Sequence, residues 1–487
     1  MTMDIKRHGL WIDGAERPGS LGQTVTVRYP YDDSIVGEVT AASEEDVGEA
    51  VGVAHRTFVE RMRSMTARER ADILRRTGAL LSERSEELAH LVVREGGKPI
   101  RDARREAGRA GQLFELAANS VASIEGRVLP MDVIQGGENR FGYTMRVPLG
   151  VVAAIAPFNS PINLAVNKIA PAIAAGNSVV LKPASNTPLS AFVLAQVLQE
   201  AGLPDGAFNV IVGSGAKLGG ALARDARVRM VTLTGSVAAG LAVAREAGIK
   251  KVALELGSSA ANIVCSDADV PGAAKSLATS AFLSSGQACI SAQRLIVHES
   301  VVDTFLEHFV PCAEAMVIGD PEDPATELGP MISVSDVDRV MAWIDEARGL
   351  GARVVVGGER AGRTIKPTLV ADVPPNASLA CEEAFAPVAT LATFSTLEEA
   401  AHIANDSQFG LQGGVYTNDI RTMFYFAREI DVGALWINDS SRYRQDNYPF
   451  GGMKQSGIGR EGVQYAIEEM TELKFIGVKL GPSAGIL

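Results

Sequence analysis

Apolar runs and amphipathic segments alternate along most of this chain, and their lengths predict an α/β protein. Apolar runs of strand length occupy residues 151–158, 178–181, 208–212 and 228–233. Helical patterns lie between several of them, at residues 189–201 and 216–224. Strands and helices in alternation are typical of a doubly wound parallel sheet, which binds a ligand at the carboxyl ends of its strands.

A second series of the same kind begins near Leu256 and predicts a second Rossmann-like lobe of similar size. Its strands are expected at residues 294–298, 354–356, 388–394, 413–416 and 434–438. Two α/β lobes leave a cleft between them, and such a cleft is a favoured place for a cofactor and a substrate to meet.

The N-terminal part predicts short strands followed by two helices. Ser43 and Asp46 form a capping box ahead of the first helix. Thr66 and Glu69 form a second one, ahead of a longer helix that ends at Gly96.

Residues 128–146 and 472–479 are expected to lie at the surface, as a hairpin or as a pair of exposed edge strands. Because an exposed strand edge invites pairing with another chain, we expect an oligomer.

The composition narrows the class of protein without naming a function. The chain has 487 residues, which predicts two or three domains, and a formal net charge of −12, which argues against a dedicated surface for nucleic acid or for an anionic membrane. No apolar run approaches the roughly 20 residues of a membrane span, and residues 1–10 lack the apolar core of a secretory signal. Four cysteines without a C-x-x-C pair, and six histidines that do not cluster with them, predict a cytoplasmic protein with free thiols and no metal site.

Three residues are candidates for chemistry, and each also has an ordinary structural explanation. Cys289 follows a run of small residues that leaves its sulfur accessible, although a buried packing cysteine is the commoner case. Glu255 lies in an apolar strand, where a carboxylate is costly unless it is paired or neutral; the alternative is a strand-end glutamate facing solvent. Asn159 follows a strand and is flanked by prolines, which suits a fixed oxyanion donor and also an ordinary turn.

A dinucleotide site is expected where a strand meets a helix, at residues 234–240. Thr234, Gly235 and Ser236, with Gly240 further on, would let a pyrophosphate approach the backbone at a helix N-terminus, although the pattern is not the usual G-x-G-x-x-G. Lys182 leaves the end of a neighbouring strand, from where it either reaches an adenosine ribose or is one more surface lysine.

Taken in order, these residues belong to strings that resemble one family. The strings A-P-F-N-S-P, L-K-P-A-S, T-G-S-x-x-x-G, L-E-L-G, G-Q-A-C, E-E-A-F-A-P-V and P-F-G-G-M-K-Q-S-G-I-G-R-E occur here in the order seen in the aldehyde dehydrogenase superfamily. The resemblance covers about residues 10–480. It implies a homodimer or homotetramer with three parts: a dinucleotide-binding domain (1–127 and 147–255), a catalytic domain (256–471) and a bridging β-element (128–146 and 472–487).

The resemblance also implies a role for each matching residue. Cys289 is expected to add to the aldehyde carbon, while the Asn159 amide and the Cys289 backbone N–H hold the oxyanion. Glu255 is expected to activate the water that hydrolyses the thioester, and Lys168 and Glu461 to relay the proton outwards. NAD or NADP is expected to contact Ile155, Ala156, Pro157, Phe158, Lys182, Ser185, Gly215, Thr234, Gly235, Ser236, Gly240, Leu256, Glu383 and Phe385.

Some positions depart from the family pattern. Ser258 and Ser259 follow L-E-L-G where Gly-Lys is common, and Ala386 replaces a glycine near the expected nicotinamide. Ser185 stands where members that prefer NAD often carry a glutamate for the adenosine ribose hydroxyls. Without that carboxylate a 2′-phosphate is not repelled, so NADP should at least be tolerated.

The segment 442–450 is similar to the R-x-D-x-x-P-F-G-G of members that handle small aldehydes with an anionic or hydroxylated tail. Arg444 is the expected charged contact, with Arg105 as a second candidate and Phe450 in the same site. The alternative is a structural ion pair between Arg444 and Asp446. Ala288 stands where some phosphonate-handling members place an arginine, which leaves an aromatic or aliphatic aldehyde open.

Two other functions compete with the oxidation of a small-molecule aldehyde to an acid. A CoA-acylating dehydrogenase of the same fold would intercept the thioester with CoA and would not need Glu255 as a base. A non-catalytic binding or structural protein would not need Cys289, Glu255 and Asn159 together. The presence of all three favours a hydrolytic enzyme.

Overall fold

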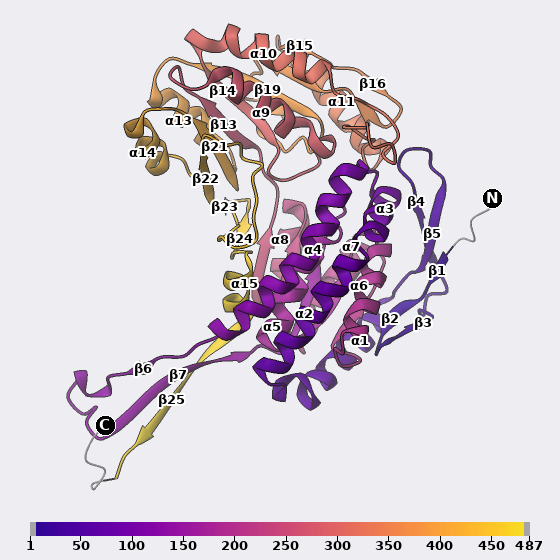
Figure 1. Ribbon diagram of the computed structural model, residues 1–487, viewed down its shortest axis with the longest axis vertical. Helices are drawn as coiled ribbons and strands as arrows, with labels where there is room; N and C mark the ends of the chain where they lie inside the picture. Colours follow the sequence, from indigo (N-terminus) through magenta and orange to yellow (C-terminus); the bar gives the residue numbers. More distant parts are fainter. Residues whose placement is uncertain (1–5, 482–487) are drawn as a thin grey trace.

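The computed structural model describes residues 6–481 and divides them between two α/β lobes and a projecting arm (Figure 1). The first lobe is built on an eight-stranded sheet with the order β24-β12-β11-β8-β9-β10-β2-β3. Its strands are β2 (Leu10–Ile12), β3 (Ala15–Arg17), β8 (Val151–Ile155), β9 (Ser178–Lys182), β10 (Phe208–Val210), β11 (Val228–Thr234), β12 (Lys251–Glu255) and β24 (Gly457–Ile458).

Strands β8 to β12 of this sheet run parallel, and β2, β3 and β24 are antiparallel additions at its edges. The chain places β9 and β10 on one side of β8 and then crosses over to place β11 and β12 on the other side. The strand order therefore reverses between β8 and β11. In open α/β sheets, ligands bind outside the carboxyl ends of the strands at such a switch point.

Helices cover both faces of this sheet because its strands are apolar on both faces. Val151 and Ala153 of β8 belong to the core that includes α1, α7 and α8, whereas Val152 and Ala154 belong to the core that includes α2 to α6 and α15. This division follows from strand geometry, since successive side chains point to opposite faces. The helices are α1 (Glu44–Glu60), α2 (Ala67–Glu83), α3 (Ser85–Gly96), α4 (Ile100–Ser120), α5 (Asn163–Ala175), α6 (Leu189–Glu200), α7 (Gly215–Arg224), α8 (Val237–Ala247) and α15 (Val463–Glu469).

The second lobe, at the top of Figure 1, contains a seven-stranded sheet with the order β15-β18-β19-β14-β13-β21-β22. All neighbouring strands are parallel except β15, which is an antiparallel edge. Its strands are β13 (Ala260–Val264), β14 (Ala292–His298), β15 (Arg353–Val356), β18 (Thr368–Ala371), β19 (Val388–Phe394), β21 (Gln412–Tyr416) and β22 (Ala434–Ile437). Helices α9 (Val270–Phe282) and α10 (Val302–Glu314) share one core with it, α13 (Leu397–Asn405) and α14 (Ile420–Glu429) a second, and α11 (Val334–Gly349) and α12 (Ser378–Cys381) a third.

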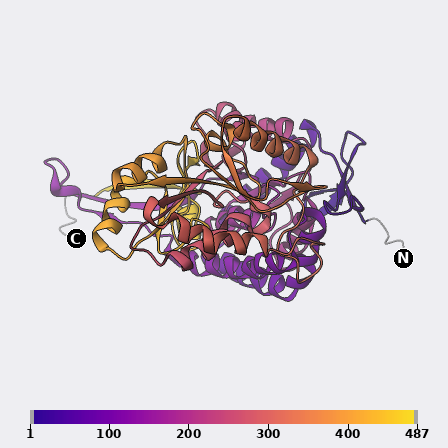
Figure 2. The ribbon, with the colours of Figure 1, turned by 90° about the horizontal axis from the view of Figure 1, so that it is seen from above.

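The arm is formed by β7 (Arg140–Pro148) and β25 (Thr471–Lys479), which pair antiparallel over their whole length, with β6 (Val128–Leu129) beside β7. Figure 1 shows it leaving the body of the molecule. In Figure 2 it lies at the end opposite the small sheet of β1 (Lys6–His8), β4 (Thr24–Arg28) and β5 (Ile35–Thr40). Two further pairs are β16 (Arg360–Ala361) with β17 (Thr364–Ile365), and β20 (Phe409–Gly410) with β23 (Met453–Lys454). The expected strand at 472–479 is thus present, and residues 482–487 of the expected bridging element lie outside the described residues.

The structure differs from the sequence-based expectations in three places. The long helix expected after Thr66 is two helices, because Arg84 leaves helical geometry (φ −96°, ψ 12°) and ends α2 before α3 begins. Helix α4 was not expected at all. It packs closely on α2, where a Cβ on Gly78 would lie 2.8 Å from the carbonyl oxygen of Gly111. Residues 457–469, assigned from the sequence to the catalytic domain, contribute β24 and α15 to the first lobe.

No helix within residues 6–481 combines the length and the apolar composition needed to cross a membrane.

Candidate active site

The central cavity lies at the switch point of the first sheet and reaches the second lobe. Its volume is about 740 Å³. The loops that follow β8 and β11 line it on one side, and residues of the second lobe line it on the other. Among the residues predicted from the sequence, it brings together Pro157, Phe158, Asn159, Thr234, Gly235, Ser236, Cys289, Glu383 and Phe385.

Cys289 is carried by a tight segment between α9 and β14. Ser284, Ser285 and Gly286 all adopt left-handed backbone angles, with φ of 54°, 57° and 65°. A side chain at Gly286 would collide with the carbonyl oxygen of Ala386, so glycine is required there on two counts. The Ser285 hydroxyl donates to the carbonyl oxygen of Gly329 at 2.8 Å and ties the segment to the rest of the lobe. Left-handed serines cost free energy, and such strain gathers at functional sites.

The thiol of Cys289 is protonated at neutral pH. Burial raises its pKa to about 12; Arg444 acts in the opposite direction, and the carboxylates of Glu383, Glu255 and Glu461 raise it further. The side chain also contacts the apolar cluster that contains Phe450. A thiolate, the nucleophilic form, therefore needs a change in its surroundings to be populated at neutral pH.

Asn159 is held by a buried ion pair behind its loop. Glu106 accepts hydrogen bonds from the backbone N–H groups of Ile162 at 3.0 Å and Asn163 at 3.3 Å, at the start of α5. Lys98 pairs with the same carboxylate and donates to the Ser160 hydroxyl at 3.1 Å. These bonds fix the chain on the C-terminal side of Asn159. This anchor was not predicted, because nothing in the local sequence distinguishes Lys98 and Glu106 from surface charges.

Glu255 is buried at the end of β12, with 4% of its surface exposed. Its Oε2 atom has no hydrogen-bond partner within the described residues. Burial raises its pKa well above the usual value, and the negative charge of Glu461 raises it further. The solvent-facing alternative is therefore wrong, and the carboxyl group is neutral in this arrangement. It lines neither the central cavity nor the smaller cavity described below.

Lys168 and Glu461 meet in a buried ion pair with an Nζ to Oε1 distance of 2.8 Å. The guanidinium of Arg444 donates to the other carboxylate oxygen of Glu461 at 2.6 Å, and it lies 3.7 Å from the centre of the Phe450 ring. Burial alone would raise the pKa of Glu461, but the two cations outweigh it and lower the pKa to about 2. Asp446 is 4.0 Å from Arg444, so the structural ion pair of Arg444 is made mainly with Glu461.

A smaller cavity of about 170 Å³ opens beside the nucleophile. Asn159 lines both cavities, and Ala288, next to Cys289 in the chain, lines the smaller one. Arg105 also lines it but is mostly exposed and pairs with Asp102 at 3.6 Å. Arg444 and Phe450 do not line it, so this arrangement does not favour them as direct substrate contacts. The cavity instead includes Arg442, which the sequence reasoning named only as the start of a segment.

The residues expected to bind the cofactor lie in three groups around the switch point. Ile155 and Ala156 are buried at the end of β8, and the ring of Phe158 meets that of Phe385 edge to face across the central cavity, with centroids 5.8 Å apart. Ser236 caps α8 by accepting from the backbone N–H of Ala239 at 3.3 Å.

Gly240 of α8 has a packing role, because a side chain there would collide with Leu256. Lys182 donates to the carbonyl oxygen of Pro183 at 3.0 Å and points towards Gly215, whose Cβ would lie 3.9 Å from its Nζ. Burial lowers the pKa of Lys182 to about 8. Ser185 donates to the carbonyl oxygen of Gly213 at 2.8 Å.

The central cavity fits a dinucleotide. The buried hydroxyl oxygen of Thr234 has no hydrogen-bond partner within residues 6–481, which leaves it free for a ligand. At Gly235 an added Cβ would meet one neighbouring atom only, at 3.6 Å, so the backbone is open to close approach. A phosphate group is favoured at the N-terminus of α8, which begins directly after these residues.

The three departures, Ser258, Ser259 and Ala386, are buried. Ser258 and Ser259 have hydroxyl oxygens without a partner within the described residues. The backbone N–H of Ser258 donates to Glu383 Oε1 at 3.0 Å, while burial raises the pKa of Glu383 to about 7. Ala386 is accommodated beside Gly286, and the preceding Phe385 takes a left-handed φ of 50°.

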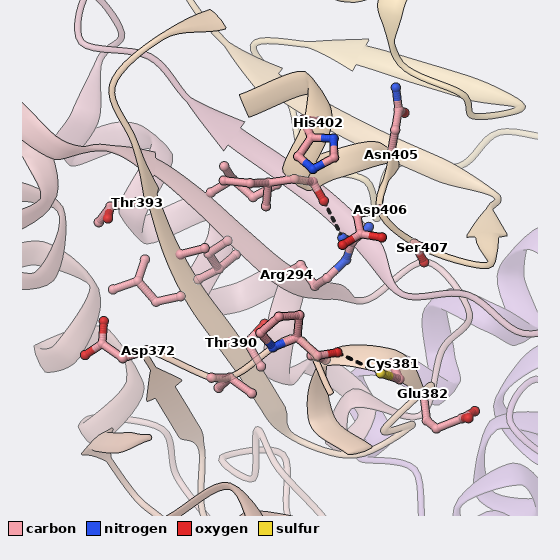
Figure 3. A pocket seen from close by; sticks show the side chains of 18 of the residues that line it. Arg294, Asp372, Cys381, Glu382, Thr390, Thr393, His402, Asn405, Asp406 and Ser407 are labelled. Atoms are coloured by element: carbon pink, nitrogen blue, oxygen red, sulfur yellow. Dashed lines mark hydrogen bonds between the residues drawn. The ribbon is translucent and has the colours of Figure 1, made fainter. Parts of the chain in front are cut away.

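A third cavity, of about 840 Å³, lies within the second lobe against β14 and β19 (Figure 3). It is larger than the central cavity but lacks Cys289 and Asn159. Its buried cation, Arg294, donates to the carbonyl oxygens of Ser259, Ile403 and Ala404 at 2.9–3.0 Å. Its guanidinium is thus committed to backbone groups, and size alone does not make this cavity the active site.

Within residues 6–481, no group of three or more His, Cys, Asp and Glu side chains is arranged to hold a metal ion.

A doubly wound sheet with a dinucleotide-sized cavity at its switch point, facing a cysteine on a second lobe, defines a dinucleotide-dependent oxidoreductase. The chain belongs to the aldehyde dehydrogenase family, whose sequence profile matches residues 17–476. It is an NAD(P)-dependent enzyme that oxidises aldehydes.

Individual relatives match over nearly the full length. The chain is 40% identical to a 3-sulfolactaldehyde dehydrogenase of Priestia aryabhattai, over 98% of this chain and 99% of that one. It is similar to the crystal structure of aldehyde dehydrogenase 21 from Physcomitrella patens in complex with the reaction product succinate, with 36% identity, TM-score 0.95 and 100% of both chains covered.

It also resembles glyceraldehyde-3-phosphate dehydrogenase from Methanocaldococcus jannaschii complexed with NADP, with 38% identity, TM-score 0.90, and 93% of this chain and 99% of that one covered. Other structural neighbours are NAD-dependent or contain NAD, and the cofactor of this family member is NAD or NADP.

Proposed function

We propose that this enzyme oxidises short polar or anionic aldehydes to carboxylic acids through a thioester on Cys289. The observation that carries the proposal is that Cys289 and Asn159 line one dinucleotide-sized cavity, while Asn159 and Ala288 also line a small polar cavity beside it. The nucleophile therefore lies between a place for the cofactor and a place for the aldehyde.

In this mechanism the Cys289 sulfur adds to the carbonyl carbon, and the Asn159 side chain donates to the resulting oxyanion together with the Cys289 backbone N–H. The anchoring of the Asn159 loop by Lys98 and Glu106 supports this role, since an oxyanion donor must be aimed before the reaction begins. NAD or NADP, held beside Thr234, Gly235 and Glu383 in the central cavity, would supply the hydride acceptor for the carbon bonded to Cys289, so that a thioester would remain on the protein.

Glu255 is the proposed base for the hydrolytic step, in which water adds to the thioester carbon and the bond to sulfur breaks. Its raised pKa makes it a strong base once it is ionised. Because it lines neither cavity, a change of its side-chain rotamer is part of the proposal. The proton taken from water would leave past the buried pair of Lys168 and Glu461, which is electrostatically coupled to Glu255.

The substrate class is supported by the small cavity and by the relatives. A volume of about 170 Å³ holds about six waters, which suits a short molecule better than an aromatic or long aliphatic one. Four basic side chains, Lys98, Arg105, Arg109 and Arg442, line it against two carboxylates, Asp102 and Glu106. The similar protein from P. aryabhattai is named for an aldehyde with a sulfonate tail.

NADP is proposed as an accepted cofactor alongside NAD. Ser185 offers a hydroxyl where a carboxylate would repel a 2′-phosphate, and Lys182 is a nearby cation. A thousandfold preference for NAD in kcat/KM would contradict this part of the proposal.

A homodimer or homotetramer is proposed from the arm. Its strands expose several large apolar side chains to solvent: Val128, Leu129, Met145, Leu473, Phe475 and Val478. Exposed apolar strands of this kind are typical of an interface. Sedimentation of the chain, with and without charged substitutions at Leu473 and Phe475, tests this part. A monomeric wild type would contradict it.

The four free cysteines support the cytoplasmic location expected from the sequence.

The mechanism is tested by Cys289→Ala, with Cys312→Ala as a matched control on α10. A panel of short semialdehydes, hydroxyaldehydes and aromatic aldehydes is followed by NAD(P)H absorbance, and the product is analysed with and without CoA. We expect the wild type to form the free acid both with and without CoA. Cys289→Ala should lose activity, and Cys312→Ala should retain it. NAD(P)H formation by Cys289→Ala, or an acyl-CoA product, would contradict the mechanism.

A further inference from the structure

Arg442 stands apart from the other cations of the small cavity because it has no carboxylate partner. Lys98 pairs with Glu106, Arg105 with Asp102, and Arg109 with Asp446. Arg442 instead donates to the hydroxyl oxygens of Ser291 at 2.9 Å and Ser284 at 3.3 Å, and forms no salt bridge with any carboxylate in residues 6–481. We infer that Arg442 binds a singly charged anionic tail of the substrate, an inference that rests on the proposed function.

The guanidinium is prepared for an anion by its position and by the donors it keeps. Only two of its five N–H groups are used in the bonds to serine. The Ser291 and Ser284 hydroxyls donate in turn to the carbonyl oxygen of Gly286 at 3.2 Å and to Asp102 Oδ2 at 3.3 Å, which holds both serines in place. Because Arg442 is partly buried and contacts no carboxylate directly, a bound anion would be stabilised by charged hydrogen bonds.

Arg442 lies near the segment that carries the nucleophile. Arg442 and Ala288 line the same cavity, and the guanidinium donates to Ser291, two residues beyond Cys289, at 2.9 Å. Because residue 288 is alanine, no long side chain enters the cavity from this position. An aldehyde bonded to Cys289 can therefore extend its tail through the cavity to Arg442.

The local charge balance selects a monoanion. One cation without a partner neutralises one negative charge, and Asp102 lies behind Ser284 as a fixed negative charge. A dianionic phosphonate would leave an uncompensated charge in a partly buried place, which is unfavourable. The predicted order of preference is a carboxylate or sulfonate tail first, then a neutral tail or a phosphonate dianion.

The inference is tested with succinic semialdehyde, its methyl ester, a three-carbon sulfonate aldehyde and the matching phosphonate. For Arg442→Met we expect the ratio of kcat/KM for succinic semialdehyde over its ester to fall by about 30-fold or more, as for loss of a charged hydrogen bond. Arg442→Lys should restore part of that ratio. Arg105→Gln removes a charge from the same cavity without removing the contact, and should change the ratio by about 3-fold or less, as for an exposed ion pair.

The outcomes separate this inference from the proposed function. The inference is overturned if the ratio of kcat/KM for the semialdehyde over its ester is unchanged in Arg442→Met, or changes equally in Arg105→Gln. Oxidation of the ester would still support the proposed function in that case. If the wild type oxidises none of the four aldehydes and no anion protects Cys289 from alkylation, both the inference and the proposed function are overturned. The kcat/KM values for the carboxylate and the sulfonate aldehyde show which of the two tails is preferred. A preference for the phosphonate aldehyde would contradict the predicted selection of a monoanionic tail.

If Arg442→Met does not fold, a second measurement decides. Propanesulfonate should slow alkylation of Cys289 in the wild type, and at least 10-fold higher concentrations should be needed in Arg442→Lys, as for weakening of one charged hydrogen bond of about 1.5 kcal/mol. No protection of the wild type, or equal protection of both, would refute the inference.

Discussion

Replacing Glu383 with glutamine should make the thiol of Cys289 more reactive, but only above the pH at which Glu383 ionises. The carboxyl group lines the central cavity with Cys289, and its charge raises the pKa of that thiol. Burial raises the pKa of Glu383 itself to about 7, against a hydrogen bond from the Ser258 backbone N–H. Below that pH Glu383 is neutral and has no charge to remove. Above it Glu383 is negative and suppresses the thiolate.

The magnitude follows from the thiol pKa of about 12. At pH 8 about one molecule in 10⁴ carries the thiolate, so ligand-free alkylation should be slow and should rise tenfold per pH unit. One charge in a partly buried site contributes on the order of 1 kcal/mol, or about fivefold in thiolate population. The ratio of the Glu383→Gln rate to the wild-type rate should therefore be near one at about pH 6 and rise to about five by pH 8.5.

The assay is iodoacetamide modification of the ligand-free enzyme, quantified at the Cys289 peptide by mass spectrometry with the Cys312 peptide as an internal reference. Glu382→Gln is the matched control, because the neighbouring Glu382 is exposed and its charge is screened by water. Its ratio should stay near one throughout. A Glu383→Gln ratio that does not change with pH, or that falls below one, would refute the electrostatic account of this thiol.

Three further predictions concern the cofactor and the scaffold. Burial lowers the pKa of Lys182 to about 8, so its charge is present below that pH and lost above it. The ratio of KM for NADP to KM for NAD should therefore rise above pH 8. A ratio that does not change with pH would contradict a contact between Lys182 and the 2′-phosphate. Glu106→Gln weakens the anchor behind Asn159 and should lower kcat about 10- to 100-fold at saturating substrate. An unchanged kcat would mean that this anchor does not contribute to catalysis. Gly240→Ala forces a methyl group into Leu256 and should cost about 1–3 kcal/mol in denaturant unfolding, whereas a neutral result would mean that α8 shifts freely.

The apolar periodicity was sufficient to predict most of the parallel strands, because buried strands need apolar residues on both faces. The capping boxes at Ser43 and Thr66 are both formed. Helix α4 was missed because much of its buried face is alanine, together with glycine at position 111. Alanine does not contrast strongly with its neighbours in a hydrophobic pattern, and the close crossing with α2 that small residues permit is a tertiary feature.

The candidate catalytic residues were predicted from short strings, but their pairing was not. Arg442 and Arg444 are two residues apart in one loop, and nothing in the local sequence tells which of them finds a carboxylate. The choice is made by Glu461, which lies 17 residues beyond Arg444 and bonds it at 2.6 Å. This pairing of Arg444 with Glu461 depends on the position of β24 and α15 in the first lobe. The domain boundaries expected from the sequence assign these elements to the catalytic domain.

The buried charges of this site divide in a way that follows its proposed chemistry. Glu461 has two cationic partners, which fix it as an anion, whereas Glu255 forms no salt bridge within residues 6–481 and is held neutral. Arg442, which is partly buried, forms no salt bridge with a carboxylate in the part of the chain that the structure describes, while its neighbour Arg444 forms one. A fold selected for stability alone would pair or remove such groups, because an unpaired buried charge costs several kcal/mol. The groups left without a partner are the ones proposed to meet water and the substrate tail, so ligand binding would supply the missing partners.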